Sequence, residues 1–258
     1  LTAVSQLPNK KERGRHMKLM VLGNTGPYPG PGGACSGYLL ESGDTRMVMD
    51  FGNGTLANLQ KHHSIDEISL IICSHLHADH ISDLFVLRYA LEQKKLMIPL
   101  FVPSEPPLEL ASLYYKNVYT IKTLSEELVL KPDHLTITFK KLKHSFLDYA
   151  IKITDGETTF LYTGDTCYTP ALGEFAKGVD VMLCDGAFLE DVVSDKHLSV
   201  KEACEIANEA GVKTLILTHF APFEDPQAYL SKGEKLFKGA LYVTEIGKSF
   251  DIKALSKN

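Results

Sequence analysis

Short apolar runs, each followed by a polar loop, dominate the first half of the chain. These runs predict strands at Lys18–Leu22, Tyr38–Glu41, Thr45–Asp50 and Leu70–Cys73. A longer spacing of apolar positions predicts helices over Thr55–Lys61 and Ile81–Glu92.

The second half of the chain repeats this alternation of strands and helices. Strands are predicted at Leu135–Leu142, Ala150–Thr154, Thr159–Thr163, Val179–Cys184, Thr214–Thr218 and Leu241–Val243. Helices are predicted at Val200–Ala210, which follows a capping box at Ser199-Val200-Lys201-Glu202, and at Pro226–Phe237. Strands in meander order with helices in both halves favour an α/β fold, in which two sheets pack face to face with helices outside.

One domain accounts for this pattern, because no repeat, low-complexity tract or linker divides the chain. We expect this domain to span residues 17–258. Leu1–His16 is polar and basic and ends directly before Met17 and a strand-like run, as at a cloning junction. We therefore interpret residues 1–16 as the remnant of an expression tag or linker; the alternative is a genuine disordered N-terminus.

Charge and cysteine content indicate which binding partners and which cellular compartment to expect. The formal net charge is −5, and no long basic run follows residue 16, which gives no support to tight non-specific binding of nucleic acid. The five cysteines are scattered and form no C-x-x-C pair, which favours reduced thiols and a cytoplasmic location. No apolar run approaches the roughly 18–20 residues of a membrane-spanning helix, so we expect no membrane partner.

The most informative segment is the loop after the apolar run Leu70–Cys73. It reads His75-Leu76-His77-Ala78-Asp79-His80 and places three histidines and a carboxylate within six residues. Imidazole and carboxylate are the usual nitrogen and oxygen ligands of zinc. Because side chains two residues apart in an extended loop point the same way, His75 and His77 can converge on one ion, and Asp79 and His80 can face a second.

Three later residues add to this ligand set. His144, Asp165 and His219 each follow a predicted strand, where a side chain is delivered to a loop. With the first loop they supply seven ligands, enough for three terminal ligands to each of two ions and one shared carboxylate. We expect two zinc ions, although His/Asp sites also accept manganese or iron.

The pattern H-x-H-x-D-H followed by a distant His, Asp and His resembles the metallo-β-lactamase superfamily. Gly23-Asn24-Thr25-Gly26 and Met49-Asp50-Phe51-Gly52-Asn53-Gly54 resemble its ribonuclease Z-type branch. The resemblance implies an αββα sandwich, with two mixed β-sheets flanked by helices, and a metal-dependent hydrolase. It assigns His75, His77 and His144 to one metal, Asp79, His80 and His219 to the other, Asp165 as the bridge, and Asp50 as the residue that orients a ligand histidine.

The bridging position also bears on the type of reaction. True β-lactamases of this fold often carry cysteine there, so Asp165 argues against a lactamase. Two metal ions lower the pKa of bound water to roughly 7 and can clamp the oxygens of a phosphoryl group. A phosphodiester suits such a site, as does an ester or lactone carbonyl.

Two further segments suggest how a leaving group gains its proton. The ribonuclease Z-like branch carries an acidic-x-x-Phe motif and a His-x-Ser/Thr motif, which are resembled here by Asp185-Gly186-Ala187-Phe188 and His197-Leu198-Ser199. This chain departs from the family pattern at the acidic residue, where the family usually has glutamate followed by alanine rather than aspartate followed by glycine. The resemblance implies that His197 protonates the leaving oxygen and that Asp185 orients it; the alternative is that His197 merely precedes a capped helix. The candidate catalytic residues are thus Asp79, Asp185 and His197.

The spacing after His144 limits the substrate. The tRNA-processing members of the family insert a long Gly- and Pro-rich arm before the bridging aspartate, whereas only 20 residues separate His144 from Asp165 here. We therefore expect a small anionic substrate, such as a cyclic nucleotide or short oligonucleotide, rather than tRNA. A homodimer is expected only by analogy with the resembling branch.

Other interpretations stay open at this point. The protein could instead be a carboxyl-ester, thioester or lactone hydrolase, or a non-catalytic metal-binding or sensor module. The loop Gly26–Gly33 lacks the Lys-Ser/Thr ending of a phosphate loop, and either borders the active site or forms a stiff turn.

Overall fold

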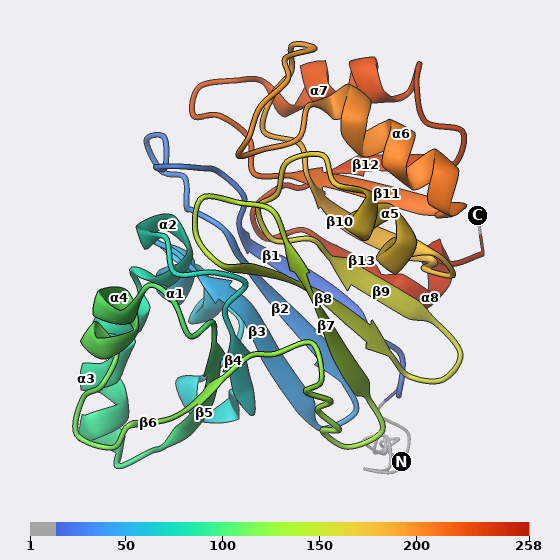
Figure 1. Ribbon diagram of the computed structural model, residues 1–258. Helices are drawn as coiled ribbons and strands as arrows, with labels where there is room; N and C mark the ends of the chain where they lie inside the picture. The colour runs from blue at the N-terminus through green and yellow to red at the C-terminus, as the bar shows by residue number, and fades with distance from the viewer. Residues whose placement is uncertain (1–13, 258) are drawn as a thin grey trace, which may run out of the picture.

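The computed structural model describes residues 14–257 and shows two mixed β-sheets packed face to face (Figure 1). The first sheet has the strand order β13-β1-β2-β3-β4-β5-β6. Its strands are β1 (Lys18–Gly23), β2 (Gly37–Ser42), β3 (Thr45–Phe51), β4 (Leu70–Ile72), β5 (Ile98–Val102), β6 (Tyr119–Thr123) and β13 (Ser249–Asp251). Strands β1 to β3 pair antiparallel as a meander, and β3 to β6 pair parallel.

The second sheet has the order β12-β11-β10-β9-β8-β7. It comprises β7 (Thr136–Leu142), β8 (Asp148–Thr154), β9 (Thr159–Tyr162), β10 (Val181–Asp185), β11 (Thr214–Thr218) and β12 (Ala240–Val243). Again the first three strands form an antiparallel meander and the later ones pair parallel, so the two halves of the chain are built alike.

Helices cover the outer face of each sheet. The first sheet is flanked by α1 (Thr55–Leu59), α2 (Ala78–Ile81), α3 (Leu84–Lys94) and α4 (Pro107–Ser112), and the second by α5 (Pro170–Ala176), α6 (Val200–Ala210) and α7 (Pro226–Gly233). A short 3-10 turn at Ile65–Glu67 and a last helix, α8 (Ile252–Leu255), complete the chain.

The strands are apolar on both faces because each sheet is buried on both faces. In β1, Leu19 and Val21 face the core between the sheets, whereas Met20 and Leu22 pack against the outer helices. Successive side chains of a strand point to opposite faces, so a strand in the middle of four layers reads as a continuous apolar run.

The αββα sandwich of two mixed sheets is confirmed, and several boundaries are corrected. The helix predicted over Ile81–Glu92 corresponds to α3, which begins at Leu84 and ends at Lys94, because Ile81 is the last residue of the separate helix α2. The helix predicted to reach Phe237 ends at Gly233. Strands β5, β6 and β13 were not predicted. Within residues 14–257, no helix is both long and apolar enough to cross a membrane.

Candidate metal centre

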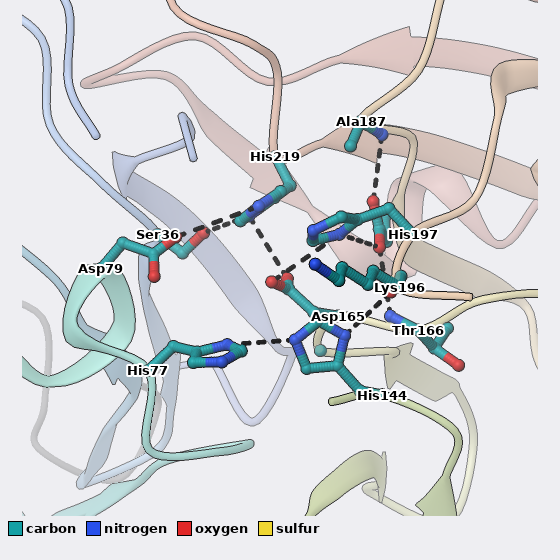
Figure 2. Close-up of polar contacts among 12 residues, drawn as sticks. Ser36, His77, Asp79, His144, Asp165, Thr166, Ala187, Lys196, His197 and His219 are labelled. Atoms are coloured by element: carbon teal, nitrogen blue, oxygen red, sulfur yellow. Dashed lines mark hydrogen bonds and ion pairs between the residues drawn. The ribbon is translucent and has the colours of Figure 1, made fainter. Parts of the chain in front are cut away.

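The polar residues singled out in the sequence gather at one end of the sandwich, where strands of both sheets finish. The His75–His80 loop follows β4, His144 follows β7, Asp165 follows β9 and His219 follows β11. Figure 2 shows five of these side chains turned toward one another from opposite sheets, namely those of His77, Asp79, His144, Asp165 and His219. Strands pairing within the sheets bring their ends together, which is why ligands separated by up to 144 residues meet here.

The first cluster consists of His75, His77, His144 and Asp165, whose ligand atoms lie within 4.8 Å of one another. His77 Nδ1 lies 2.8 Å from His75 Nε2 and 3.0 Å from His144 Nε2. An Asp165 carboxylate oxygen lies 3.7 Å from His75 Nε2.

The outer nitrogen of His75 has an acceptor that holds its proton away from the cluster. Ser74 Oγ donates to Asp50 at 2.9 Å, which leaves its lone pairs free to accept from His75 Nδ1 at 3.0 Å. Asp148 Oδ1 lies 3.3 Å from the same nitrogen. With the proton on Nδ1, the Nε2 lone pair of His75 faces the cluster.

His77 and His144 also have a polar partner on the ring nitrogen that faces away from the cluster. His144 Nδ1 donates to the carbonyl oxygen of Lys196 at 2.8 Å, and His77 Nε2 lies 3.3 Å from the hydroxyl of Ser145. Their inner nitrogens therefore present lone pairs to one another and to His75. Three converging lone pairs repel unless a cation lies between them, so this donor set suits a metal ion.

The second cluster consists of Asp79, His80, Asp165 and His219, all of them buried. His80 donates from Nδ1 to Asp50 at 2.7 Å, and its Nε2 lies 3.3 Å from Asp165 and 3.6 Å from Asp79. Among residues 14–257, this buried Nε2 has no hydrogen-bond partner. A buried nitrogen with its lone pair aimed at two carboxylates also fits a metal ion, and Asp165 belongs to both clusters.

Asp50 is the anchor behind the second cluster. Besides His80, its carboxylate accepts from the Ser74 backbone N–H at 2.7 Å, the Ser74 hydroxyl at 2.9 Å and the Tyr162 hydroxyl at 2.6 Å. Burial, together with Asp50, raises the pKa of Tyr162 well above its usual value, so the phenol stays a donor. Asp50 itself has φ 57°, a conformation rare outside glycine, asparagine and aspartate that is tolerated where the surroundings hold it.

Asp148 is a buried acid that the sequence analysis missed. Neither of its carboxylate oxygens has a hydrogen-bond partner in the described chain, although Oδ1 faces His75 at 3.3 Å. Burial raises the pKa of Asp148 well above its usual range, and the carboxylates of Asp165 and Asp50 add to this. The available signal was an aspartate in the apolar stretch Leu147-Asp148-Tyr149-Ala150, which lay before the predicted start of that strand.

The electrostatics of the histidines differ between the clusters. Burial lowers the pKa of His77 to about 4 and that of His75 well below its usual value, so both are neutral, as metal ligands must be. Burial also acts to lower the pKa of His80, but Asp165, Asp50 and Asp79 outweigh it and raise that pKa well above the usual value. A metal ion at the second cluster would replace a proton there.

His197 and Asp185 lie together beside the two clusters. His197 Nδ1 is 3.0 Å from Asp185 Oδ2, and the same carboxylate accepts from the backbone N–H groups of Thr166 at 3.1 Å and Ala187 at 3.0 Å (Figure 2). Burial alone would lower the pKa of His197, but the Asp185 carboxylate overrides it and raises the pKa to about 9. The ring also stacks on His219 with centroids 4.9 Å apart.

The loops that carry this pair are tied together. The Phe188 N–H donates to the Leu198 carbonyl at 3.2 Å, and the Val200 N–H donates to the Phe188 carbonyl at 3.0 Å. The predicted capping box is confirmed: Ser199 Oγ accepts from the Glu202 N–H, and the Glu202 carboxylate accepts from the Ser199 N–H. The start of α6 thus fixes the turn that presents His197.

A cavity of about 410 Å³ opens onto both clusters. It is lined by Pro27, His77, Ala78, Asp79, His144, Ser145, Asp165, Lys196, His197 and His219. The Gly/Pro loop therefore borders the site, and Gly26 explains how it approaches so closely. A Cβ at Gly26 would lie 2.1 Å from the His219 ring, so no larger residue fits without displacing that histidine.

Comparisons with known proteins agree with this architecture. Residues 45–220 match the family model described as a β-lactamase superfamily domain. YhfI of Bacillus subtilis, described as a probable metallo-hydrolase, is 30% identical over 245 residues, covering 90% of this chain and 98% of its own. Its crystal structure superposes with a TM-score of 0.87 over 91% of this chain and 98% of that one.

Two less similar proteins also resemble this chain. Ribonuclease Z of Saccharolobus solfataricus is 25% identical over 275 residues, covering 86% of this chain and 94% of that protein. A diphosphatase from the PhnP family shares the fold, with a TM-score of 0.71 at 15% identity over 91% of this chain and 97% of that one. On the family match, the identity to a metallo-hydrolase over nearly its whole length and the two His/Asp clusters, the chain belongs to the metallo-β-lactamase superfamily and is a metal-dependent hydrolase.

Proposed function

We propose that the protein is a dinuclear zinc phosphodiesterase that acts on a small phosphodiester. The observation that carries the proposal is the position of Asp165, which is shared by two complete ligand clusters and has the Asp185–His197 pair 3.8 Å away. His75, His77 and His144 would hold one ion, Asp79, His80 and His219 the other, and Asp165 both. Bound divalent ions would supply Lewis acidity, which makes a hydroxide nucleophile available near neutral pH.

The protein's own contribution to the leaving group comes from His197. Its Nδ1 is engaged by Asp185, so the proton available to a substrate is the one on Nε2. Asp185 is held by two backbone N–H groups and cannot turn away, which keeps the imidazole in one orientation. An alkoxide leaving from phosphorus needs such a proton, whereas a thiolate leaving from a thioester does not, so the pair favours phosphodiester cleavage over thioester hydrolysis.

The size of the site supports a small substrate. The cavity measures about 410 Å³, and the chain between His144 and Asp165 folds into β8, β9 and the tight turn between them. No segment there extends from the body of the fold as a tRNA-binding arm would. The ribonuclease Z and diphosphatase neighbours therefore support phosphodiester or phosphoanhydride chemistry here, while tRNA is not our proposed substrate.

The test is turnover by the zinc-loaded protein with bis-p-nitrophenyl phosphate and a panel of cyclic nucleotides. Acyl-homoserine lactones and glutathione thioesters serve as the competing substrate classes. Phosphodiester turnover well above that of Asp165→Ala, with about two equivalents of zinc per chain, is the expected result. Cleavage of lactones or thioesters alone would replace the proposal with an acyl hydrolase, and failure to bind metal would indicate a non-catalytic module.

A further inference from the structure

Lys196 is a cation at the rim of the cavity with no function in the scheme above. Its side chain is exposed and lines the same cavity as the metal-cluster residues. Figure 2 shows the side chain running from its backbone near His144 back across the site toward His197 and Asp165. Its ammonium group is therefore presented to whatever occupies the cavity.

The backbone of Lys196 is held from both sides. Its N–H donates to Ser194 Oγ at 3.0 Å, and its carbonyl accepts from His144 at 2.8 Å. The next residue, His197, is bound to Asp185. Because its backbone is fixed between two site histidines, the base of the lysine side chain is held at the rim of the cavity.

The ammonium group has no acidic partner in the part of the chain that the structure describes. Some other lysines of this half are paired, for example Lys213 with Asp180 at 2.6 Å and Lys177 with Glu174 at 2.7 Å. Asp195 is adjacent in sequence, yet it forms no ion pair with Lys196 among the described residues. This cation would add positive charge at a site where two bound divalent ions would outweigh the carboxylates of Asp79 and Asp165.

From this we infer that Lys196 binds a second phosphoryl group of the substrate, one that is not cleaved. The inference rests on the proposed phosphodiesterase function. A substrate with one negative charge would satisfy the metal centre and leave the ammonium without a partner, whereas a substrate with two phosphoryl groups satisfies both. The substrate class is then a nucleotide-like phosphodiester or phosphoanhydride that carries a further phosphate.

Lys196→Ala tests this without disturbing the fold, because the residue is exposed and its hydrogen bonds use only the backbone. Lys196→Arg keeps the charge. Lys201→Ala is the matched control, since Lys201 is an exposed lysine of α6 that pairs with Glu205 at 4.0 Å and does not line the cavity.

The first readout is binding rather than turnover. Titration calorimetry on the zinc-loaded protein compares thymidine 5′-monophosphate with thymidine 5′-diphosphate and thymidine 3′,5′-bisphosphate. We expect at least one two-phosphate ligand to bind about 10-fold more tightly than the monophosphate, as one charge-assisted contact allows. This preference should disappear in Lys196→Ala and persist in Lys196→Arg and Lys201→Ala.

The second readout separates this inference from the proposed function. The p-nitrophenyl ester of thymidine 5′-phosphate is compared with the same ester carrying a 3′-phosphate. In Lys196→Ala, KM for the second ester should rise with little change in kcat.

Turnover of both esters with binding preferences unchanged in Lys196→Ala would overturn the inference and leave the phosphodiesterase intact. No turnover, with Lys196-dependent binding of a two-phosphate ligand, would overturn the function and leave the anion site; absence of binding would overturn the inference.

Discussion

The two metal-ligand clusters share Asp165 but differ in what lies behind them. In the first, His144 and His77 are held by a backbone carbonyl and a serine hydroxyl, and both histidines line the open cavity. In the second, every ligand is buried and His80 is held by the carboxylate of Asp50. A carboxylate behind a histidine makes it a more basic and better oriented ligand. We therefore expect the second cluster to bind its ion more tightly and the first to be the more adaptable.

The largest expected effect comes from removing the residue that both clusters share. Asp165→Ala should lower kcat/KM by about 1000-fold or more, because loss of the shared carboxylate withdraws several kcal/mol of stabilisation of transition-state charge. Measured zinc content should fall below two equivalents. Asp44→Ala, in the exposed β2–β3 turn, is the control and should behave as the wild type. Full activity in Asp165→Ala would contradict the dinuclear site.

His197→Ala should leave both clusters loaded and affect only the leaving group. For a phosphodiester with an alkyl leaving group, we expect a loss of about 100-fold in kcat, whereas p-nitrophenolate, which leaves without a proton, should be affected several-fold at most. The measurement compares the rates for the two classes of ester, with zinc content as the control. An equal loss for both leaving groups would assign His197 to binding instead of proton transfer.

Asp50→Asn tests the support of the second cluster. The amide retains the shape but loses the charge and one acceptor, so zinc affinity at the tighter site should fall by about 10- to 100-fold. Competition against a chelator of known affinity would measure it. Circular dichroism would show whether the fold survives the loss of a buried acceptor for the Tyr162 hydroxyl. If the weaker site changed instead, the assignment of Asp50 to the second cluster would be wrong.

Asp148→Asn should have the smallest effect, and this effect should be on the first cluster. Its contact with His75 is longer, at 3.3 Å, and is shared with Ser74, so we expect zinc affinity at the weaker site to fall by about 10-fold. The same chelator competition, run beside Asp50→Asn, shows which of the two sites each variant weakens. Identical profiles for the two variants would remove the distinction between the clusters.

Much of the fold was predictable because its strands are buried on both faces and stand out as apolar runs. The prediction failed where that signal weakens. Strand β5, Ile-Pro-Leu-Phe-Val, contains a proline, and β6 is an edge strand with exposed residues. Strand β13 has three residues and pairs with β1 from the far end of the chain. Its existence depends on a partner that local sequence does not indicate.

The metal site shows the same division between local and tertiary information. The cluster His75–His80 is contiguous, so spacing alone indicated metal ligands. Distant His144, Asp165 and His219 joined the predicted ligand set because each follows a predicted strand, and only resemblance divided the ligands between two ions. The structure brings these residues together with the first loop. Asp148 gave only a weak sequence signal, as an aspartate in an apolar stretch, and Lys196, a lysine in a loop, gave none.

By itself, the sequence determined the chemistry that this protein can perform: histidines and aspartates after apolar strands, in a spacing that makes a metal-dependent hydrolase. Only the tertiary structure decided how these groups act. It placed Asp165 between two clusters, put Asp50 and Asp148 behind different histidines, and brought Lys196 to the rim of the cavity. The physical reason is that ligand type is a property of one residue, whereas charge pairing, burial and orientation arise from neighbours that folding supplies.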